Sequence, residues 1–476
     1  MNMVAETSVQ TKLASDLAKF LGDKGWLQDS EAIEPYVTEW RNMWRGACIG
    51  VARPTSTQEV ASVVQMCGRV GIAITPQGGN TGLVGGGVPN GGIVLSTSRL
   101  NKIRDFDGVN QTITVEAGCI LSAIQTRALE DGLMFPLSLG AEGTCQIGGN
   151  LSTNAGGVGV LRYGNARDLM LGLEVVLPNG EILNNINGLR KNNTGYELNH
   201  LFMGAEGTLG IITAATLKLY PAPKSRQTSL VAMPNVDAAL DVFVRLRAMA
   251  GHCLTAFEII NRQALELVER HVSDTVCKFE HEHPYYALVE LSSPRQGDQL
   301  REIMENCLGA SLEAGTASDA LLAESDTQAE MFWRLRETIP EAQVLAGASV
   351  KHDISVPVSA IPSLVKNASE AVKEILPSVR IVAFGHMGDG NLHFNLSQPG
   401  NMDGEKFLEM WRTFNDAVHG IAVALDGSFS AEHGIGTLKR SDLAQYRSPA
   451  AVNLMRLLKS SIDPDDLMNP GKVIPD

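Results

Sequence analysis

The sequence predicts an α+β fold with more than one domain, and three observations support this prediction. From about residue 72 to residue 220, short β-rich runs alternate with glycine clusters. Residues 221–224, Pro-Ala-Pro-Lys, have the composition of a linker. Beyond residue 224 glycines are few, and longer helical and strand patterns alternate. A chain of 476 residues is long enough for two or three domains.

The elements follow in order along the chain. Residues 1–46 are predicted as an N-terminal helical segment, because apolar residues recur at helical spacing before Gly22 and Gly25. Ser56-Thr57-Gln58-Glu59 has the pattern of a capping box and predicts the start of an amphipathic helix. In the glycine-rich part, strands are expected over 72–75, 93–96, 112–115, 173–177 and 210–220, with a helix over 120–130. After the linker, helices and strands are expected within 237–250, 286–291, 299–308, 319–336 and 361–376, as two helix-strand units on one sheet.

Composition excludes several classes of protein. The net charge of -14 argues against a nucleic-acid surface, which needs clustered Lys and Arg. No apolar run reaches the roughly 18 residues of a membrane span, and no basic segment followed by an apolar one opens the chain. The seven cysteines are scattered, without a CxxC pair, which is typical of reduced thiols. We therefore expect a soluble, cytoplasmic protein without a transmembrane segment.

The segment from Phe384 to Asn395 predicts a hairpin with two imidazoles on one face. Asp389-Gly390 between apolar residues is a strong signal for a two-residue turn. Pairing outward from that turn sets His386 opposite His393, with Asn395 facing the same way. The two histidines could then bind one metal ion, with a third ligand from residues 431–436, which place an acid beside an imidazole. The alternative is a His-capped turn in an ordinary sheet.

Three glycine-rich stretches, at 76–87, 136–157 and 204–212, could bind a polyphosphorylated ligand. The first follows a predicted strand, but it matches neither the G-x-G-x-x-G fingerprint nor a Walker loop. Residues without Cβ nevertheless allow close backbone approach, and successive N–H groups can form a nest for a pyrophosphate. The alternative for each stretch is a surface loop.

Together with GHMGDGNLH at 385–393 and AEHGIG at 431–436, these loops resemble the FAD-linked D-2-hydroxyacid dehydrogenases of the vanillyl-alcohol oxidase and p-cresol methylhydroxylase (PCMH) superfamily. The resemblance spans about residues 47–475. It implies a PCMH-type FAD-binding domain of two α+β subdomains over 47–222. It also implies a ferredoxin-like α+β substrate cap with a metal site over 223–430, and a C-terminal segment over 431–476 that returns to the FAD domain.

The resemblance also implies site residues. The FAD pyrophosphate would lie on Pro76, Gly78, Gly79, Asn80, Thr81 and Gly82. The ribityl and isoalloxazine side would meet Pro136, Gly143, Thr144, Gly149, Asn150, Thr153, Asn154 and Gly157. Glu206 and Ile211 would meet the adenine end, and Asn469 would return from the tail. Family members that attach FAD covalently use a His or Cys, and since 76–87 has neither, noncovalent FAD is expected, with Cys145 left as the other candidate.

For the cap, the resemblance implies Zn²⁺ or another divalent metal bound by His386, His393 and Glu432, with His433 as the catalytic base. Arg336 and Lys351 would bind the substrate carboxylates, with Asn395 and His433 also at the substrate. Glu432 and His433 can face one site only if the chain bends there, which Gly434 permits.

The expected reaction is oxidation of a D-2-hydroxy acid to the 2-oxo acid, with D-2-hydroxyglutarate as first choice. Pro340 stands where hydroxyglutarate-specific members carry a hydroxyl side chain, so D-lactate and D-malate remain alternatives. Two further alternatives are a non-redox flavoprotein of the same fold and a non-catalytic FAD-binding subunit. The expected partners are the small acid and a separate electron acceptor, such as an electron-transfer flavoprotein or a quinone; a homodimer is left open.

Overall fold

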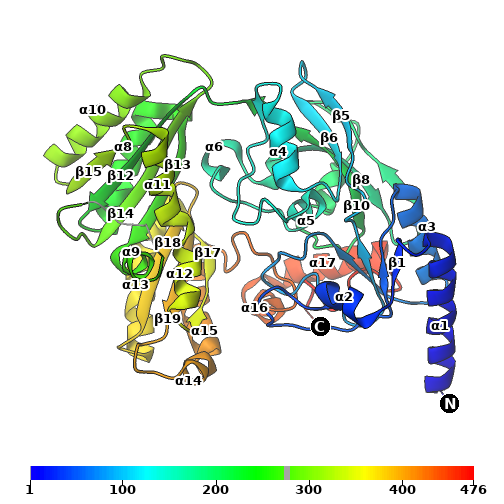
Figure 1. Ribbon diagram of the computed structural model, residues 1–476. Helices are drawn as coiled ribbons and strands as arrows, with labels where there is room; N and C mark the ends of the chain where they lie inside the picture. Colours follow the sequence, from blue (N-terminus) through cyan, green and yellow to red (C-terminus); the bar gives the residue numbers. More distant parts are fainter. Residues whose placement is uncertain (1, 273–278, 476) are drawn as a thin grey trace. The chain divides into compact units, whose positions relative to one another are not determined.

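The computed structural model describes residues 2–272 and 279–475, and the chain forms two compact units (Figure 1). Unit 1 comprises Met1–Gly156, Gly164–Pro221 and Glu432–Asp476, and unit 2 comprises Gly157–Tyr163 and Ala222–Ala431. The N-terminal 46 residues belong to unit 1. The short insertion 157–163 in unit 2 was not expected from the sequence.

One sheet of unit 1 has four strands in the order β1-β2-β4-β3, with β2, β4 and β3 parallel and β1 antiparallel. Its strands are β1 Trp26–Leu27, β2 Val51–Ala52, β3 Ile74–Gln77 and β4 Ile93–Ser96. The helices before and between them are α1 Asn2–Leu21, α2 Ser30–Val37 and α3 Thr57–Gly68. Ser56 caps α3 by accepting the Glu59 N–H at 3.2 Å, so the predicted helix start is confirmed.

The other large sheet of unit 1 is antiparallel, in the order β5-β6-β10-β8-β9. Its strands are β5 Ile103–Asp107, β6 Thr112–Glu116, β8 Met170–Val176, β9 Ile182–Asn184 and β10 Ile211–Lys218. The remaining elements are α4 Leu121–Leu129, α5 Ile147–Ser152, α7 Ala166–Leu169, the 3₁₀ turn η1 Leu198–Leu201, and the pair β7 Leu133–Met134 and β11 Tyr220–Pro221.

The C-terminal residues complete unit 1. After α16 (Arg440–Tyr446) and α17 (Pro449–Ile462), the tail bridges Met468 to Ile74 of β3, and the Asn469 N–H donates to the Ile74 carbonyl at 2.8 Å. Lys459 near the end of α17 anchors this return. Its ammonium donates to the carbonyl oxygens of Thr208 at 3.0 Å and Met468 at 2.8 Å. The first and last parts of the chain thus share one body.

Unit 2 is built on an antiparallel sheet whose first four strands have the order β15-β12-β14-β13. In chain order this is fourth, first, third, second, the arrangement of a β-α-β-β-α-β ferredoxin-like unit. The elements are β12 Ser225–Met233, α8 Val236–Ala250, η2 Gly251–Cys253, β13 Leu254–Asn261, α9 Arg262–His271, β14 Tyr285–Ser293, α10 Leu300–Glu313 and β15 Asp319–Leu322. The predicted α+β class and the predicted cap arrangement are both confirmed.

The sheet of unit 2 continues beyond β13 through β18 and β19, with β16 and β17 both paired to β19. These strands are β16 Ser349–Val350, β17 Asp353–Ser355, β18 Arg380–His386 and β19 Asn391–Ser397. The accompanying helices are α6 Val160–Tyr163, α11 Asp326–Glu337, α12 Ile339–Leu345, η3 Val358–Ala360, α13 Ile361–Ile375, α14 Gly404–Glu409 and α15 Trp411–Ala424.

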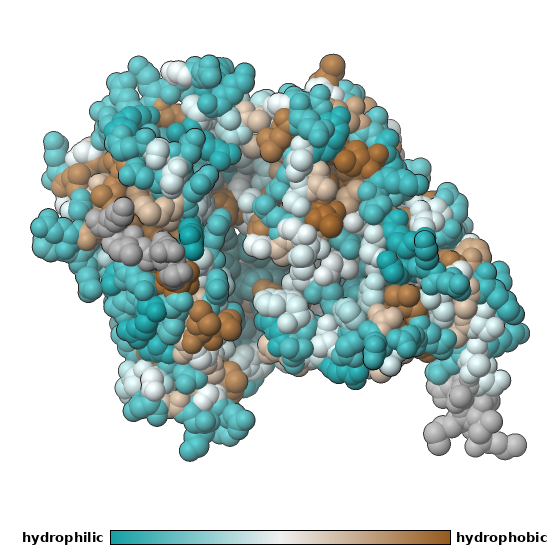
Figure 2. Space-filling model, in the orientation of Figure 1, coloured by the Kyte–Doolittle hydropathy of each residue, from teal (hydrophilic) through white to brown (hydrophobic). Residues whose placement is uncertain are grey.

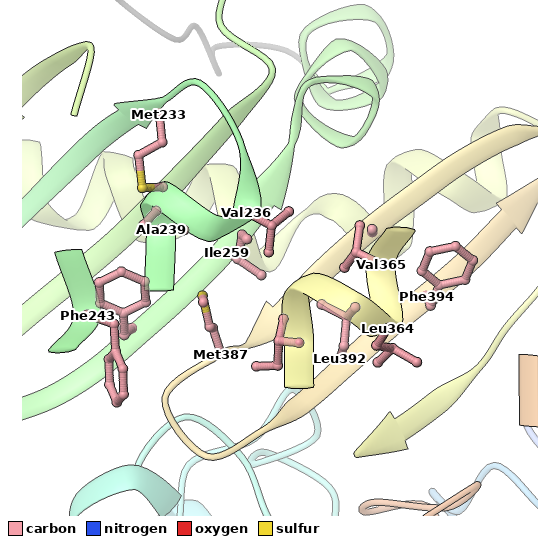
Figure 3. Packing of buried hydrophobic residues seen from close by; sticks show 14 of the residues in the cluster. Met233, Val236, Ala239, Phe243, Ile259, Leu364, Val365, Met387, Leu392 and Phe394 are labelled. Atoms are coloured by element: carbon pink, nitrogen blue, oxygen red, sulfur yellow. The ribbon is translucent and has the colours of Figure 1, made fainter. Parts of the chain in front are cut away.

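Each face of this sheet has its own hydrophobic core. On one face, Phe257 of β13 and Met387 after β18 belong to a core that also includes residues of α8 and α13. Figure 3 shows Met387 in this core beside Ile259 of β13. On the other face, Phe384 of β18 packs with residues of α9, α11 and α12. Because side chains alternate along a strand, residues 258 and 386 point away from the Phe257 and Met387 face. The second face is the one that carries the candidate site in unit 2.

The polar character of the surface and the free state of the cysteines agree with what the composition predicts. Hydrophilic residues dominate the face drawn in Figure 2, with hydrophobic residues in separate groups. Six cysteines in the described residues are free thiols, and Cys277 lies outside the described residues. Within 2–272 and 279–475, no helix combines the length and the apolar character needed to cross a membrane.

Candidate active site

The first glycine-rich loop of unit 1 leaves β3 and is closed by Gln77. The Gln77 amide donates to the carbonyl oxygens of Tyr36 and Gly87, both at 2.8 Å. Asn80 has a φ of +53° and donates to the carbonyls of Pro35 at 3.1 Å and Thr38 at 3.0 Å. A non-glycine residue adopts this left-handed conformation only where the surroundings hold it. The loop is therefore fixed at its ends and near its middle.

The backbone of this loop fits a phosphate-binding role. The N–H groups of Gly79, Asn80, Thr81 and Gly82 have no acceptor within the part of the chain that the structure describes. A Cβ at Gly79 would lie 2.3 Å from the Thr144 carbonyl oxygen, so two of the predicted loops are in direct backbone contact. Unpaired N–H groups beside closely packed backbone are what a nest for a pyrophosphate requires.

A pocket opens along these loops, and it lies entirely within unit 1. Eleven of the predicted cofactor residues line it: Pro76, Gly78, Gly79, Asn80, Thr81, Gly82, Gly149, Asn150, Thr153, Glu206 and Ile211. Six of the predicted residues do not line it: Pro136, Gly143, Thr144, Asn154, Gly157 and Asn469. Of these, Gly157 belongs to unit 2. Cys145 lines the pocket, and burial raises the pKa of its thiol, which disfavours the thiolate.

Two buried amide oxygens near the pocket are hydrogen-bond acceptors that could receive a donor from a ligand. Among the residues that the structure describes, Asn150 Oδ1 is buried and has no hydrogen-bond partner, and Asn150 lines the pocket. Asn469 Oδ1 is in the same state, while its amide nitrogen donates to the carbonyls of Gly86 at 3.0 Å and Glu206 at 2.8 Å. Buried amide oxygens are normally satisfied, so a ligand with N–H or O–H donors fits here. The isoalloxazine and ribityl groups of FAD carry such donors.

Glu206 holds the turn that follows His433. Its carboxylate accepts the N–H groups of Ile435 at 2.7 Å and Gly436 at 2.9 Å. Burial raises the pKa of Glu206, and the two N–H donors act against that rise. Gly434 has a φ of +80°, so the chain bends directly after His433 as the sequence required. His433 lines the pocket together with the glycine loops, and contact of the Glu206 carboxylate with adenine stays a prediction.

In unit 2 the hairpin differs in register from the prediction. His393 pairs with Phe384, not with His386, which is a shift of two residues. The loop has four residues, 387–390, because Met387 is buried in the core and the Gly388 N–H donates to Phe257 of β13 at 3.2 Å. The predicted direct opposition of the two histidines is therefore wrong. A shift of two residues preserves the face, however, since side chains alternate with a period of two.

The two histidines accordingly lie together on one face. The centroids of the His386 and His393 rings are 5.6 Å apart. His386 Nδ1 is 2.6 Å from Oε1 of Glu258, its partner on β13, and His393 Nδ1 is 3.9 Å from Oδ1 of Asp353, its partner on β17. A carboxylate beside each imidazole is a common arrangement around histidine ligands of metals.

Arg336 reaches the same face from α11. Its Nε donates to Glu258 Oε2 at 2.7 Å, and its guanidinium carbon lies 4.8 Å from the centroid of the Phe384 ring. Only 8% of Arg336 is exposed. Burial by itself would raise the pKa of Glu258, but the imidazole of His386 and the guanidinium of Arg336 together lower it to about 2. Glu258 is therefore a carboxylate at neutral pH.

The other predicted substrate residues lie nearby in the same unit. Asn395 is buried; its amide donates to Gln343 Oε1 at 2.8 Å, and its oxygen accepts the His352 N–H at 3.1 Å. Lys351 lies half-buried between β16 and β17. Asn395 is thus engaged by neighbouring groups, and direct contact of either residue with a substrate stays a prediction.

Sequence reasoning missed Glu258 and Asp353. Glu258 is the lone acid in the apolar strand Leu254–Asn261, and a charged residue in such a run is a signal of a buried partner. Asp353 follows Lys351 and His352 in a polar group inside a strand region. Neither signal says which side chain is the partner, because strand pairing decides that.

The chain is similar to known protein families and to characterised proteins over most of its length. The family model for the C-terminal domain of FAD linked oxidases matches residues 222–473, and the model for an FAD binding domain matches residues 49–185. A D-2-hydroxyglutarate dehydrogenase of Xanthomonas citri pv. viticola is 40% identical over 93% of this chain and 92% of its own length. A mitochondrial D-2-hydroxyglutarate dehydrogenase of Arabidopsis thaliana is 37% identical over 98% of this chain and 82% of its own.

A solved structure supports the fold independently. The structure of p-cresol methylhydroxylase with substrate bound covers 98% of this chain and 97% of its own, with a TM-score of 0.79 and 18% identity. The predicted PCMH-type fold is confirmed. Because the name of the Arabidopsis relative places it in mitochondria, the cytoplasmic location of this chain stays a prediction.

Proposed function

The chain belongs to the family of FAD-linked D-2-hydroxyacid dehydrogenases. From this premise we propose that it oxidises D-2-hydroxyglutarate to 2-oxoglutarate with the help of a bound divalent metal, for which Zn²⁺ is the first choice. The observation that carries the proposal is the position of His433. This imidazole lines the same pocket as the glycine loops that fit FAD. Removal of the proton from the hydroxyl group on C2 of the substrate requires a base at the flavin pocket.

Noncovalent FAD is the proposed cofactor. The loops at 78–82 and 149–153, with the tail at Asn469, would hold it, and when bound it supplies the acceptor for the hydride from C2 of the substrate. The raised thiol pKa of Cys145 makes a covalent attachment there unfavourable. His433 would accept the proton of the 2-hydroxyl group, a role that imidazole commonly plays as a general base.

For the metal we propose His386, His393 and Glu432 as ligands. The two imidazoles share a face of the unit 2 sheet. The chain reaches Glu432 directly from Ala431, whose N–H donates to the Asp353 carbonyl at 3.2 Å, and Asp353 is the strand partner of His393. Imidazole and carboxylate ligands with open positions suit zinc. When bound, the metal would supply Lewis-acid stabilisation of the substrate hydroxyl oxygen.

Two cations would orient the diacid. Glu258 accepts the Nε–H of Arg336, and within residues 2–272 and 279–475 no side chain is seen to accept its terminal N–H groups, which would bind a carboxylate. Lys351 would bind the second carboxylate as a point charge, with Asn395 positioning the strand beside it. Electrons would then pass to a separate acceptor, an electron-transfer flavoprotein or a quinone.

D-lactate and D-malate are the second candidates. Pro340 occupies the first turn of α12, where it has no hydroxyl to offer the distal group of a longer acid. A smaller acid would not need that hydrogen bond. A non-redox reaction of the same fold would leave the flavin oxidised when a 2-hydroxy acid is added.

The test is anaerobic flavin reduction by D- and L-2-hydroxy acids, with His433→Ala beside His200→Ala, an exposed histidine of the same unit. We expect D-2-hydroxyglutarate to bleach the wild-type flavin, and chelation to slow the reaction. His433→Ala should lower the rate by about 10²- to 10⁴-fold with FAD still bound, whereas His200→Ala should not. Preference for L-isomers, or normal reduction in His433→Ala, would refute the assignment.

A further inference from the structure

Glu258 lies on the face of the unit 2 sheet that also carries His386 and His393. It lies on β13 directly opposite His386 of β18. Its strand neighbours Phe257 and Ile259 face the opposite core. Only 1% of Glu258 is exposed, so its carboxylate has almost no contact with bulk water. A charge buried to this extent needs partners of opposite charge or strong donors.

Both carboxylate oxygens are used by different residues. Oε1 is 2.6 Å from His386 Nδ1, and Oε2 accepts Arg336 Nε at 2.7 Å. An ionised carboxylate only accepts hydrogen bonds, so the proton on this edge of the imidazole resides on Nδ1. In a neutral imidazole the lone pair is then on Nε2, the nitrogen on the far side of the ring. One side chain therefore determines the tautomer of His386 and the orientation of Arg336.

We propose that Glu258 is a positioning residue shared by the metal site and the substrate-carboxylate site. It presents Nε2 of His386 to the metal, and it holds Arg336 by Nε so that the terminal N–H groups of the guanidinium face the substrate. This inference rests on the proposed function, because it takes His386 as a metal ligand and Arg336 as a carboxylate-binding residue. Glu258 itself contacts neither the substrate nor the metal.

Glu258 would orient both His386 and Arg336, and this distinguishes it from a carboxylate that only stabilises the fold. Replacement by Gln preserves the shape, but an amide has one oxygen to accept with and an N–H₂ group that faces the other donor. Either His386 or Arg336 then loses its acceptor. Both the metal affinity and the binding of the substrate carboxylate should change, although neither ligand touches residue 258.

The experiment measures Zn²⁺ affinity of the metal-free, FAD-loaded full chain by competition with a chromogenic chelator. The variants are Glu258→Gln and Glu258→Asp, with Glu290→Gln as the control. Glu290 is a carboxylate on the neighbouring strand β14 that accepts the Trp333 Nε1–H at 2.9 Å and contacts no proposed ligand. FAD content and the melting temperature establish that each variant is folded.

We expect Glu258→Gln to raise the zinc dissociation constant by about 10- to 100-fold, the usual effect of losing the carboxylate behind a histidine ligand. The KM for D-2-hydroxyglutarate at saturating zinc should rise as well, since Arg336 loses its support. Glu258→Asp retains two acceptor oxygens, so its zinc dissociation constant should fall between those of wild type and Glu258→Gln. Glu290→Gln should match wild type in both measurements.

Unchanged zinc affinity in folded Glu258→Gln, with tight binding by wild type, would overturn the role of Glu258 and leave the proposed function standing. If Glu258→Gln does not fold, Glu258→Asp decides by the same criterion. Absence of zinc binding by wild type would instead overturn the proposed metal, and the role of Glu258 with it.

Discussion

Replacement of Gly79 by alanine tests how the flavin pocket is built. A Cβ at this position would lie 2.3 Å from the Thr144 carbonyl oxygen and 3.1 Å from the Cys145 Cα. Real Cβ contacts essentially never fall below 3.0 Å, so the two loops must separate by at least 3.0 minus 2.3, or 0.7 Å. Both obstacles are backbone atoms, which cannot rotate away as a flexible side chain could.

The cost of this separation falls mainly on cofactor binding. Overpacking of this kind costs about 1–3 kcal/mol. The loop can move outward in the apoprotein, and FAD binding must then restore its position against that cost. At about 1.4 kcal/mol per tenfold change, the FAD dissociation constant should rise by about 5- to 150-fold. The melting temperature of the apoprotein should change little.

The assay is titration of apoprotein with FAD, followed by quenching of flavin fluorescence. Gly140→Ala is the matched control, because a Cβ there meets nothing within 4 Å and Gly140 does not line the pocket. An FAD dissociation constant within twofold of wild type for Gly79→Ala would refute the reasoning. So would an equal loss of affinity in Gly140→Ala, since a general effect of glycine removal would then explain both.

Three further predictions concern other parts of the molecule. Lys459→Met removes the cationic partner of Asp463, whose side chain is 1% exposed, and leaves that carboxylate with the backbone N–H donors of Leu467 and Met468. The variant also loses two hydrogen bonds from the ammonium to backbone carbonyls, so we expect the free energy of unfolding by urea to fall by about 3 kcal/mol. A loss below 1 kcal/mol would contradict this expectation. The pKa of Glu258 is about 2 in the folded protein against 4.5 in the unfolded chain, so its contribution to stability is present above pH 4.5 and is lost as the pH falls towards 2. The difference in free energy of unfolding between wild type and Glu258→Gln, measured with denaturant on the metal-free protein, should therefore narrow between pH 4.5 and pH 2. A difference that widens as the pH falls would refute this direction. Pro340→Thr should raise the ratio of kcat/KM for D-2-hydroxyglutarate over D-lactate by about 2- to 10-fold, the value of one hydrogen bond; an unchanged ratio would exclude a hydroxyl contact at position 340.

The hairpin at 380–397 illustrates how far sequence reasoning reaches. Alternation along a strand placed His386 and His393 on one face, and the structure agrees because that face depends only on residue parity. The register was two residues off. The Asp389-Gly390 signal describes a local turn, whereas the observed loop is set by the burial of Met387 and by the bond from Gly388 to Phe257.

Glu206 illustrates a different limit. Its position in a glycine-rich loop was evident from the sequence, and the loop does line the pocket. The carboxylate, however, binds the N–H groups of Ile435 and Gly436, more than two hundred residues away. The chemical type of a residue is local information, but its partner depends on how distant segments return to one another.

The sequence by itself determined the α+β class, the glycine loops of the cofactor domain and the side chains that we propose for proton transfer and metal binding. These features follow from local periodicity, from the absence of Cβ atoms and from side-chain chemistry. Only the tertiary structure decided the strand register, the return of the tail to β3 and the use of Glu258 by both His386 and Arg336. Such choices depend on which apolar surfaces can be buried together, and that is a property of the whole chain and not of any one segment.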